Sequence, residues 1–178
     1  MVWNSDPTNL GAELQTLMMY PIPAASIIQA WRGRMYAVQY MPSDDQTVIW
    51  MSQPLGFHLF DLGKDFFLVP GKVEMLAPHD GGLTIGTDTR VYAYTQDKIE
   101  EIAPYGVVPG WHWAEDDGRI LFWSKRGLCA ALPFANLTER QVSAAPGLSA
   151  GGVVIRSGGQ KRYLVALQRG GAAFNSYS

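Results

Sequence analysis

A serine motif is the first place where this sequence could carry chemistry. Residues Gly147-Leu148-Ser149-Ala150-Gly151 match the G-x-S-x-G pattern of a hydrolase nucleophile. That pattern needs a strand before the serine and a helix after it, so that the hydroxyl stands exposed on a sharp turn. Here Ala144-Ala145-Pro146 comes before the motif, and a glycine-led strand is expected after it. We therefore interpret Ser149 as part of a loop. Of three function classes, namely a structural subunit, a carbohydrate-binding module and a small hydrolase, the hydrolase is the weakest.

The three histidines do not follow a metal-binding pattern. His58, His79 and His112 lie far apart in the sequence, whereas the ligands of structural metal sites usually come in closely spaced pairs. We expect each histidine to be a turn or packing residue. The sequence also has no glycine-rich phosphate loop followed by a lysine. It therefore predicts no metal site and no cofactor.

Three aspartates could supply paired carboxylates for catalysis. Asp80 and the pair Asp116-Asp117 could suggest glycoside cleavage, in which two carboxyl groups flank the scissile bond. Both sites fall in corresponding turns of successive sequence repeats, where a short acidic side chain bonds the local backbone. The turn-forming role is the better interpretation. We predict no catalytic residue, and we expect that the protein is not an enzyme.

Aromatic residues leave a binding function open. The chain has six tryptophans, and Trp111 and Trp113 lie near Tyr105 in the sequence. Flat aromatic rings could line a shelf for sugars, because they pack against the apolar faces of sugar rings. The alternative, which we favour, is that they fill the cores of the sheets and the contacts between subunits.

The composition indicates a strand-and-turn protein with an apolar surface. Hydrophobic residues make up 47% of the 178 residues and charged residues only 17%, against about 25% in globular domains. A net charge of −2 gives no general attraction to nucleic acid or anionic membranes. The small basic cluster of Lys161, Arg162 and Arg169 is expected to be a solvated strand face. Cys129, in an apolar setting, is expected to be a buried structural thiol.

The first 25 residues are expected to be a lead-in strand or linker. Apolar residues at helical spacing also allow a short helix there, which the prolines at 21 and 23 would end. The start of the chain lacks the basic and apolar regions of a signal peptide. No apolar run approaches the roughly 18 residues of a membrane-spanning helix. The residues at helical spacing are Leu10, Leu14, Leu17 and Met18.

From residue 26 onward, the hydrophobic pattern has the period of strands, and glycine, proline or aspartate bounds each run. We therefore assign residues 26–178 to one all-β domain with four groups of strands. The expected strands are 26–31, 34–40, 47–52 and either 57–61 or 65–69; 73–77, 83–87, 90–95 and 98–103; 111–115, 119–123, 127–132 and 138–143; and 152–156 and 161–167. Repeated positions in these strands predict buried side chains at Tyr36, Val38, Val48, Trp50, Leu83, Ile85, Val91, Leu121 and Leu164.

A turn glycine recurs once in each strand group. Gly33, Gly82, Gly118 and Gly159 mark these turns, at intervals of roughly 40 residues, which is typical of propeller blades. We predict a propeller-like fold of about four antiparallel blades, of which the last is two strands short. A β-sandwich, which also has short strands at regular spacing, is the alternative.

Two phrases of the sequence resemble a known family. Trp31-Arg32-Gly33-Arg34-Met35-Tyr36-Ala37 with Val48-Ile49-Trp50-Met51-Ser52-Gln53-Pro54 is similar to a "GRLY…VYYSEP" phrase. That phrase occurs in propeller domains of bacteriophage virion proteins, including tail nozzle proteins of short-tailed phages. Val69-Pro70-Gly71-Lys72-Val73 and Asp80-Gly81-Gly82-Leu83-Thr84-Ile85-Gly86-Thr87 resemble the "PG-x-I…DGGLFVGT" continuation of the family. The resemblance covers roughly residues 24–95, with a looser match to the end.

The resemblance implies a virion structural protein of the tail, neck or capsid, made in the host cytoplasm. Its partners would be copies of itself and other virion proteins, with no specific nucleic acid. The short last strand group and the apolar tail at 171–174 also favour a homo-oligomeric or particle-bound subunit. A carbohydrate-binding propeller module that acts at a cell surface is the alternative.

Overall fold

The computed structural model describes residues 19–95, 97–138 and 145–169, and all regular structure in these ranges is β-strand. The all-β prediction is confirmed. The strands form several antiparallel sheets, and no sheet closes on itself. The expected helix at Leu10 to Met18 and the apolar tail at 171–174 lie outside the described residues, as does most of the strand expected at 138–143.

The first sheet has six strands, and β4 is its centre. One end of β4 pairs with β6, while its other end pairs with β5. Two runs that the sequence offered as alternatives, at 57–61 and 65–69, therefore both form strands. In spatial order the sheet contains β1 (Met19–Tyr20), β5 (Gly56–Asp61), β4 (Gln46–Gln53), β3 (Arg34–Met41) and β2 (Ile27–Trp31), with β6 (Phe66–Pro70) on β4.

The next two sheets are meanders of four strands, and the last is a hairpin. The second sheet contains β7 (Val73–His79), β8 (Gly82–Thr87), β9 (Val91–Thr95) and β10 (Lys98–Ala103). The third contains β11 (Ala114–Asp116), β12 (Arg119–Ser124), β13 (Gly127–Ala131) and β14 (Ala135–Asn136). The terminal hairpin consists of β15 (Ser149–Ser157) and β16 (Gln160–Gln168).

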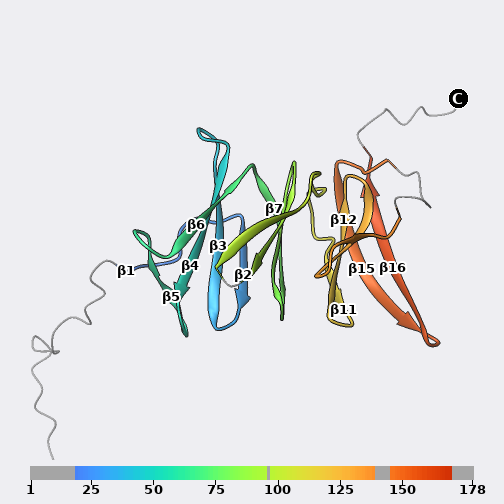
Figure 1. Ribbon diagram of the computed structural model, residues 1–178, viewed down its shortest axis with the longest axis horizontal. Helices are drawn as coiled ribbons and strands as arrows, with labels where there is room; N and C mark the ends of the chain where they lie inside the picture. The colour runs from blue at the N-terminus through green and yellow to red at the C-terminus, as the bar shows by residue number, and fades with distance from the viewer. Residues whose placement is uncertain (1–18, 96, 139–144, 170–178) are drawn as a thin grey trace, which may run out of the picture.

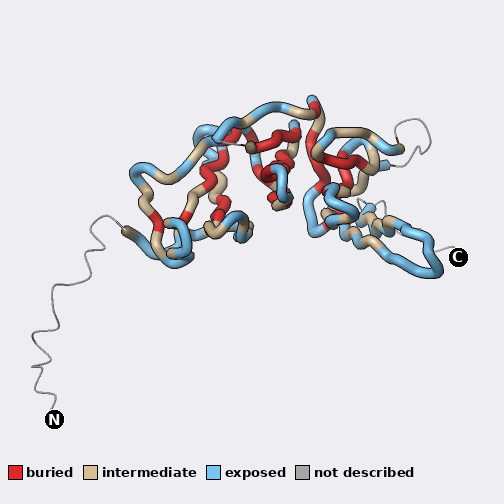
Figure 2. Tube along the Cα trace, turned by 60° about the horizontal axis from the view of Figure 1, so that its bottom comes forward, coloured by how far each residue is buried: buried red, intermediate tan, exposed pale blue. Residues whose placement is uncertain are grey.

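The four sheets follow one another in chain order, side by side (Figure 1). Viewed from another side they form an open arc, with the buried residues inside and between the sheets (Figure 2). Three apolar clusters join them, one between each pair of neighbours. The clusters unite Ile49 with Leu83, Val91 with Phe122, and Trp123 with Ala150. Because each core lies between two sheets, no sheet buries its apolar face alone.

Each sheet contains a hairpin closed by a two-residue turn, and in all sheets but the first this hairpin comes first. These turns are Arg32-Gly33, Asp80-Gly81, Asp117-Gly118 and Gly158-Gly159. In all but the second, both residues have positive φ, for example 46° and 72° in the first turn. Such turns match the twist of the strands that they join and favour glycine. The recurrence seen in the sequence is therefore real, but Gly81 and not Gly82 occupies the turn, because Gly82 already begins β8.

Two other predictions need correction. The strand expected at 111–115 is shortened to β11, because the preceding segment bonds to the terminal hairpin instead of joining the ladder. Leu164 is half-exposed, since it lies on the outer face of the terminal hairpin, and Trp50 and Leu121 are only half-buried. The remaining residues predicted to be buried are indeed buried: Tyr36, Val38, Val48, Leu83, Ile85 and Val91.

Candidate binding groove

A groove runs beside β2 of the first sheet and β7 of the second sheet. It has a volume of about 360 Å³ and is lined by residues 26–28, 72–76, 110, 111 and 113. The strands β2 and β7 lie next to each other here. The segment before β11 forms the remaining wall. Three parts of the chain that are distant in sequence therefore meet at one site.

Two tryptophans form the aromatic wall of this groove. The ring centroids of Trp111 and Trp113 lie 5.6 Å apart, with the planes tilted by 35°. Trp111 is 68% exposed, whereas Trp113 also packs against the core between the second and third sheets. Tyr105, which the sequence grouped with them, instead packs in that core and contacts Phe134. The structure thus brings the two tryptophans together at the groove, whereas Tyr105 does not line it.

The segment that carries Trp111 is fixed on both sides. The carbonyls of Pro109 and Trp111 accept hydrogen bonds from the backbone N–H groups of Ala150 and Gly152, at 2.8 and 3.0 Å. The hydroxyl of Tyr163 donates to the carbonyl of His112. These bonds tie the segment to the terminal hairpin, so the exposed indole of Trp111 sits on a well-anchored backbone.

Gly110 makes this close approach possible. Its φ is +125°, and a Cβ there would lie 2.1 Å from the carbonyl oxygen of Ala150. Only glycine has neither the side chain that would collide nor the steric restriction against this φ. The glycine therefore brings the tryptophan segment into contact with the hairpin.

His112 anchors the same segment from the opposite side. Its side chain is fully buried; Nε2 donates to the carbonyl of Val108 at 2.6 Å, and Nδ1 accepts from the N–H of Trp123 at 3.0 Å. This pair of bonds defines a neutral ring with its proton on Nε2. Burial lowers the pKa of the His112 imidazole below its ordinary value of 6.5, which also favours the neutral form.

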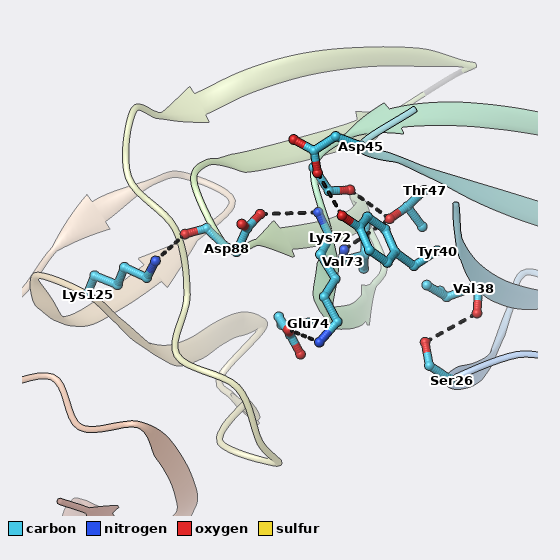
Figure 3. Close-up of polar contacts among 11 residues, drawn as sticks. Ser26, Val38, Tyr40, Asp45, Thr47, Lys72, Val73, Glu74, Asp88 and Lys125 are labelled. Carbon is cyan, nitrogen blue, oxygen red and sulfur yellow. Dashed lines mark hydrogen bonds and ion pairs between the residues drawn. The ribbon is translucent and has the colours of Figure 1, made fainter. Parts of the chain in front are cut away.

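An ion pair supplies the charged part of the groove. Lys72 Nζ and Glu74 Oε1 are 2.7 Å apart, and both residues line the groove (Figure 3). The lysine side chain is half-exposed and the glutamate side chain largely buried. The backbone around them is held by the buried Thr47, whose hydroxyl donates to the carbonyl of Gly71 and accepts from the N–H of Val73. Nothing in the sequence pattern identified this pair.

The aspartate pair and part of the basic cluster form one ion-pair network away from the groove. Arg156 lies 2.5 Å from Asp116, and Lys161 bonds to Asp117. The Arg156 guanidinium, followed by Lys161, holds the pKa of the Asp116 carboxyl below its ordinary value. The carboxylates therefore connect the third sheet to the terminal hairpin. Asp117 lies in the turn after β11, whereas Asp116 is the last residue of that strand.

The other residues that could carry chemistry lie apart. His58 is exposed on β5, whereas Nδ1 of His79 accepts a bond from the N–H of Gly81 within the β7–β8 turn. Within residues 19–95, 97–138 and 145–169, no three side chains of metal-ligand type gather at one place. Ser149 does not lie in a loop as expected but begins β15, with no helix after it, so the nucleophile geometry is not formed. Cys129 is buried, as expected.

No family model matches the chain, and comparison with curated proteins and with solved structures found no similar protein. In the part of the chain that the structure describes, no helix is long and apolar enough to cross a membrane.

Proposed function

We propose that this chain is a non-enzymatic structural protein of a bacteriophage virion. It acts through protein–protein contacts in a symmetric assembly, with copies of itself and neighbouring virion proteins as partners. The support from the sequence is its resemblance to propeller domains of virion proteins. The support from the structure is the exposed apolar face of the first sheet and of the terminal hairpin.

The observation that carries this proposal is an apolar outer face at each end of the arc. In the first sheet, Ile28, Trp50 and Phe66 lie in one cross-strand row, on the face opposite to the core. Of these, Ile28 is 50% exposed and Phe66 is 37% exposed. Ala37, which lies between Ile28 and Trp50 in this row, is fully buried, and Ile28 also lines the groove. Exposed apolar side chains on an outer sheet face are typical of a protein–protein contact.

The terminal hairpin presents a second row of this kind. Val153 and Leu164 lie directly opposite each other, and about half of each side chain is exposed. The alternate residues Tyr163 and Val165 pack against the third sheet instead. Every internal sheet of the arc is covered on both sides by its neighbours, so the exposed rows mark where further sheets would stack.

The same arrangement supports a propeller-like interpretation of the fold. Neighbouring sheets meet through strands near one edge: β2 lies beside β7, β7 contacts β12, and β11 lies beside β15. Each sheet then proceeds away from these strands as an antiparallel meander. In this proposal the four sheets are blades, and the terminal hairpin is the incomplete one.

The decisive test locates the protein in purified phage particles. Mass spectrometry should find it at a fixed copy number, and electron microscopy should place the hairpin row against another subunit. Sedimentation tests the contact in solution: the wild-type chain should associate, and Val153→Lys with Leu164→Lys should shift it toward monomer. Leu148→Lys, at an exposed turn residue before β15, is the matched control. Absence from particles, together with a monomer unaffected by the double substitution, would refute the proposal.

A further inference from the structure

We propose that the groove beside Trp111 binds an uncharged oligosaccharide, with one sugar ring stacked on the indole and its hydroxyls bonded to the Lys72–Glu74 pair. This activity goes beyond the structural role, which requires no small ligand. It rests on three observations: how Trp111 is held, what lies beside it, and the size of the groove.

Trp111 differs from the tryptophans that stabilise the fold. The indole N–H groups of Trp31, Trp50 and Trp123 donate to the carbonyl of His79, the side chain of Gln39 and the carbonyl of Pro146. Within the described ranges, the Trp111 indole donates to no protein acceptor, and most of its surface is exposed.

An indole that is 68% exposed contributes little to stability through burial. Yet its backbone is bonded to Gly152, and the adjacent Gly110 is pressed against Ala150. This support fixes the backbone that carries Trp111, and the Trp113 ring packs beside the indole. The segment therefore presents an exposed aromatic ring to a partner outside the described fold.

The groove combines an apolar ring with a balanced pair of charges. A sugar ring needs both, since its C–H face packs on an aromatic surface while its hydroxyls donate and accept hydrogen bonds. The Lys72 ammonium can donate to a hydroxyl, and the Glu74 carboxylate can accept from one. Their charges cancel, so the groove does not favour an anionic ligand. An uncharged polyhydroxyl compound fits this chemistry better than a phosphate or a uronic acid.

The volume of the groove is also suitable for a small sugar ligand. About 360 Å³ falls at the small end of ligand sites. The site is an open groove between strand edges and not an enclosed cavity, so a chain of sugars could continue beyond the ring on Trp111. Binding through one stacked ring and a few hydroxyls is expected to be weak, with a Kd of roughly 0.1–1 mM.

The test uses the full chain with cellohexaose, maltohexaose and chitohexaose as probes in isothermal titration calorimetry. At least one should bind. Trp111→Ala should then weaken binding about tenfold or more, Trp111→Phe should keep much of the affinity, and Glu74→Gln should lower it about fivefold. Leu55→Ala, which also removes an exposed apolar side chain but lies outside the groove, should leave the affinity unchanged.

A second measurement follows binding on the wild-type chain and uses only the conservative variant Trp111→Phe, for assignment. Incorporation of 5-fluorotryptophan gives six tryptophan signals by NMR, and the signal missing in Trp111→Phe identifies Trp111. Saturating oligosaccharide should move that signal most. The proposal is overturned if none of the probes binds at about 10 mM, roughly ten times the weakest expected Kd. It is equally overturned if Trp111→Ala leaves sugar binding intact, or if Trp111→Ala weakens sugar binding only because it dissociates an oligomer. The particle and sedimentation tests of the structural role are unaffected by any of these results.

Discussion

The replacement of His112 by alanine is the sharpest test of how the tryptophan segment is held. The imidazole is fully buried and bridges two backbone groups, the carbonyl of Val108 and the N–H of Trp123. Both groups lie where the third sheet meets the terminal hairpin. Alanine removes both hydrogen bonds and most of the volume of the ring, and it leaves the two backbone groups without these partners.

The expected cost follows from these losses. An intramolecular hydrogen bond contributes about 1 kcal/mol net, and a buried backbone group left unsatisfied costs about 1–3 kcal/mol. Partial relaxation and entry of water reduce the total, so we expect His112→Ala to lower the free energy of unfolding by about 3–5 kcal/mol. Because a domain is stable by only about 5–15 kcal/mol, this is a large share of the total.

Urea denaturation at pH 7.5, followed by circular dichroism and by tryptophan fluorescence, measures this loss. His58→Ala is the matched control, since His58 is exposed and should cost less than about 0.5 kcal/mol. A loss below about 1 kcal/mol for His112→Ala would show that the ring does not anchor the segment.

The pH dependence provides a second readout of the same residue. Burial places the pKa of His112 in the folded protein below the ordinary value of 6.5. As the pH falls, His112 is therefore protonated in the unfolded chain before it is protonated in the folded protein. The stabilising contribution of the neutral, buried His112 is complete above about pH 6.5, and it is lost as the pH falls toward the pKa of His112 in the folded protein. The wild type should lose stability between pH 7.5 and pH 5. In His112→Asn, whose side chain does not titrate, this component of the pH dependence should disappear.

Three further predictions follow from the packing. Gly110→Ala should destabilise by more than about 2 kcal/mol, because the Cβ would meet the Ala150 carbonyl at an unfavourable φ; urea denaturation measures it. Asp116→Asn should speed amide hydrogen exchange in β16 at pH 7, because it removes the charge that pairs with the terminal hairpin. In the wild type, the pKa of Asp116 is lowered, so the protection of β16 from exchange is lost only as the pH falls below about 4. Ile49→Ala should cost about 3–5 kcal/mol and Leu164→Ala less than about 1 kcal/mol, and the reverse order would contradict the assigned faces.

The strands were predictable where the signals were local. The aromatic and β-branched residues of β3, the aspartate-glycine turn at Asp117-Gly118 and the double glycine at Gly158-Gly159 are local signals that depend only on neighbouring residues. The segment from Trp111 to Trp113 does not form the expected strand for a physical reason. Trp111, His112 and Trp113 alternate as strand residues do, but the segment bonds to a hairpin about 40 residues away, and the sequence spacing does not reveal such bonds.

The groove could be predicted only in part. Trp111 and Trp113 lie close together in the sequence, and this spacing indicated that their rings could line a binding site. The ion pair of Lys72 and Glu74 could not be assigned to them, because it reaches the groove only when the second sheet stacks beside the third. Tyr105 was misplaced for the same reason, since its ring turns into the core between those sheets.

The segment from Val108 to Trp113 connects the two proposed activities, and this connection allows them to be separated. It fastens the terminal hairpin, which carries the outward row at Val153 and Leu164, and it also presents Trp111 to the groove. Loss of the His112 anchor should therefore weaken self-association and sugar binding together. Trp111→Ala should affect sugar binding alone, while Leu164→Lys should affect self-association alone. If Leu164→Lys also abolished sugar binding, the groove would have to be completed by a neighbouring subunit, and the two activities would share one site.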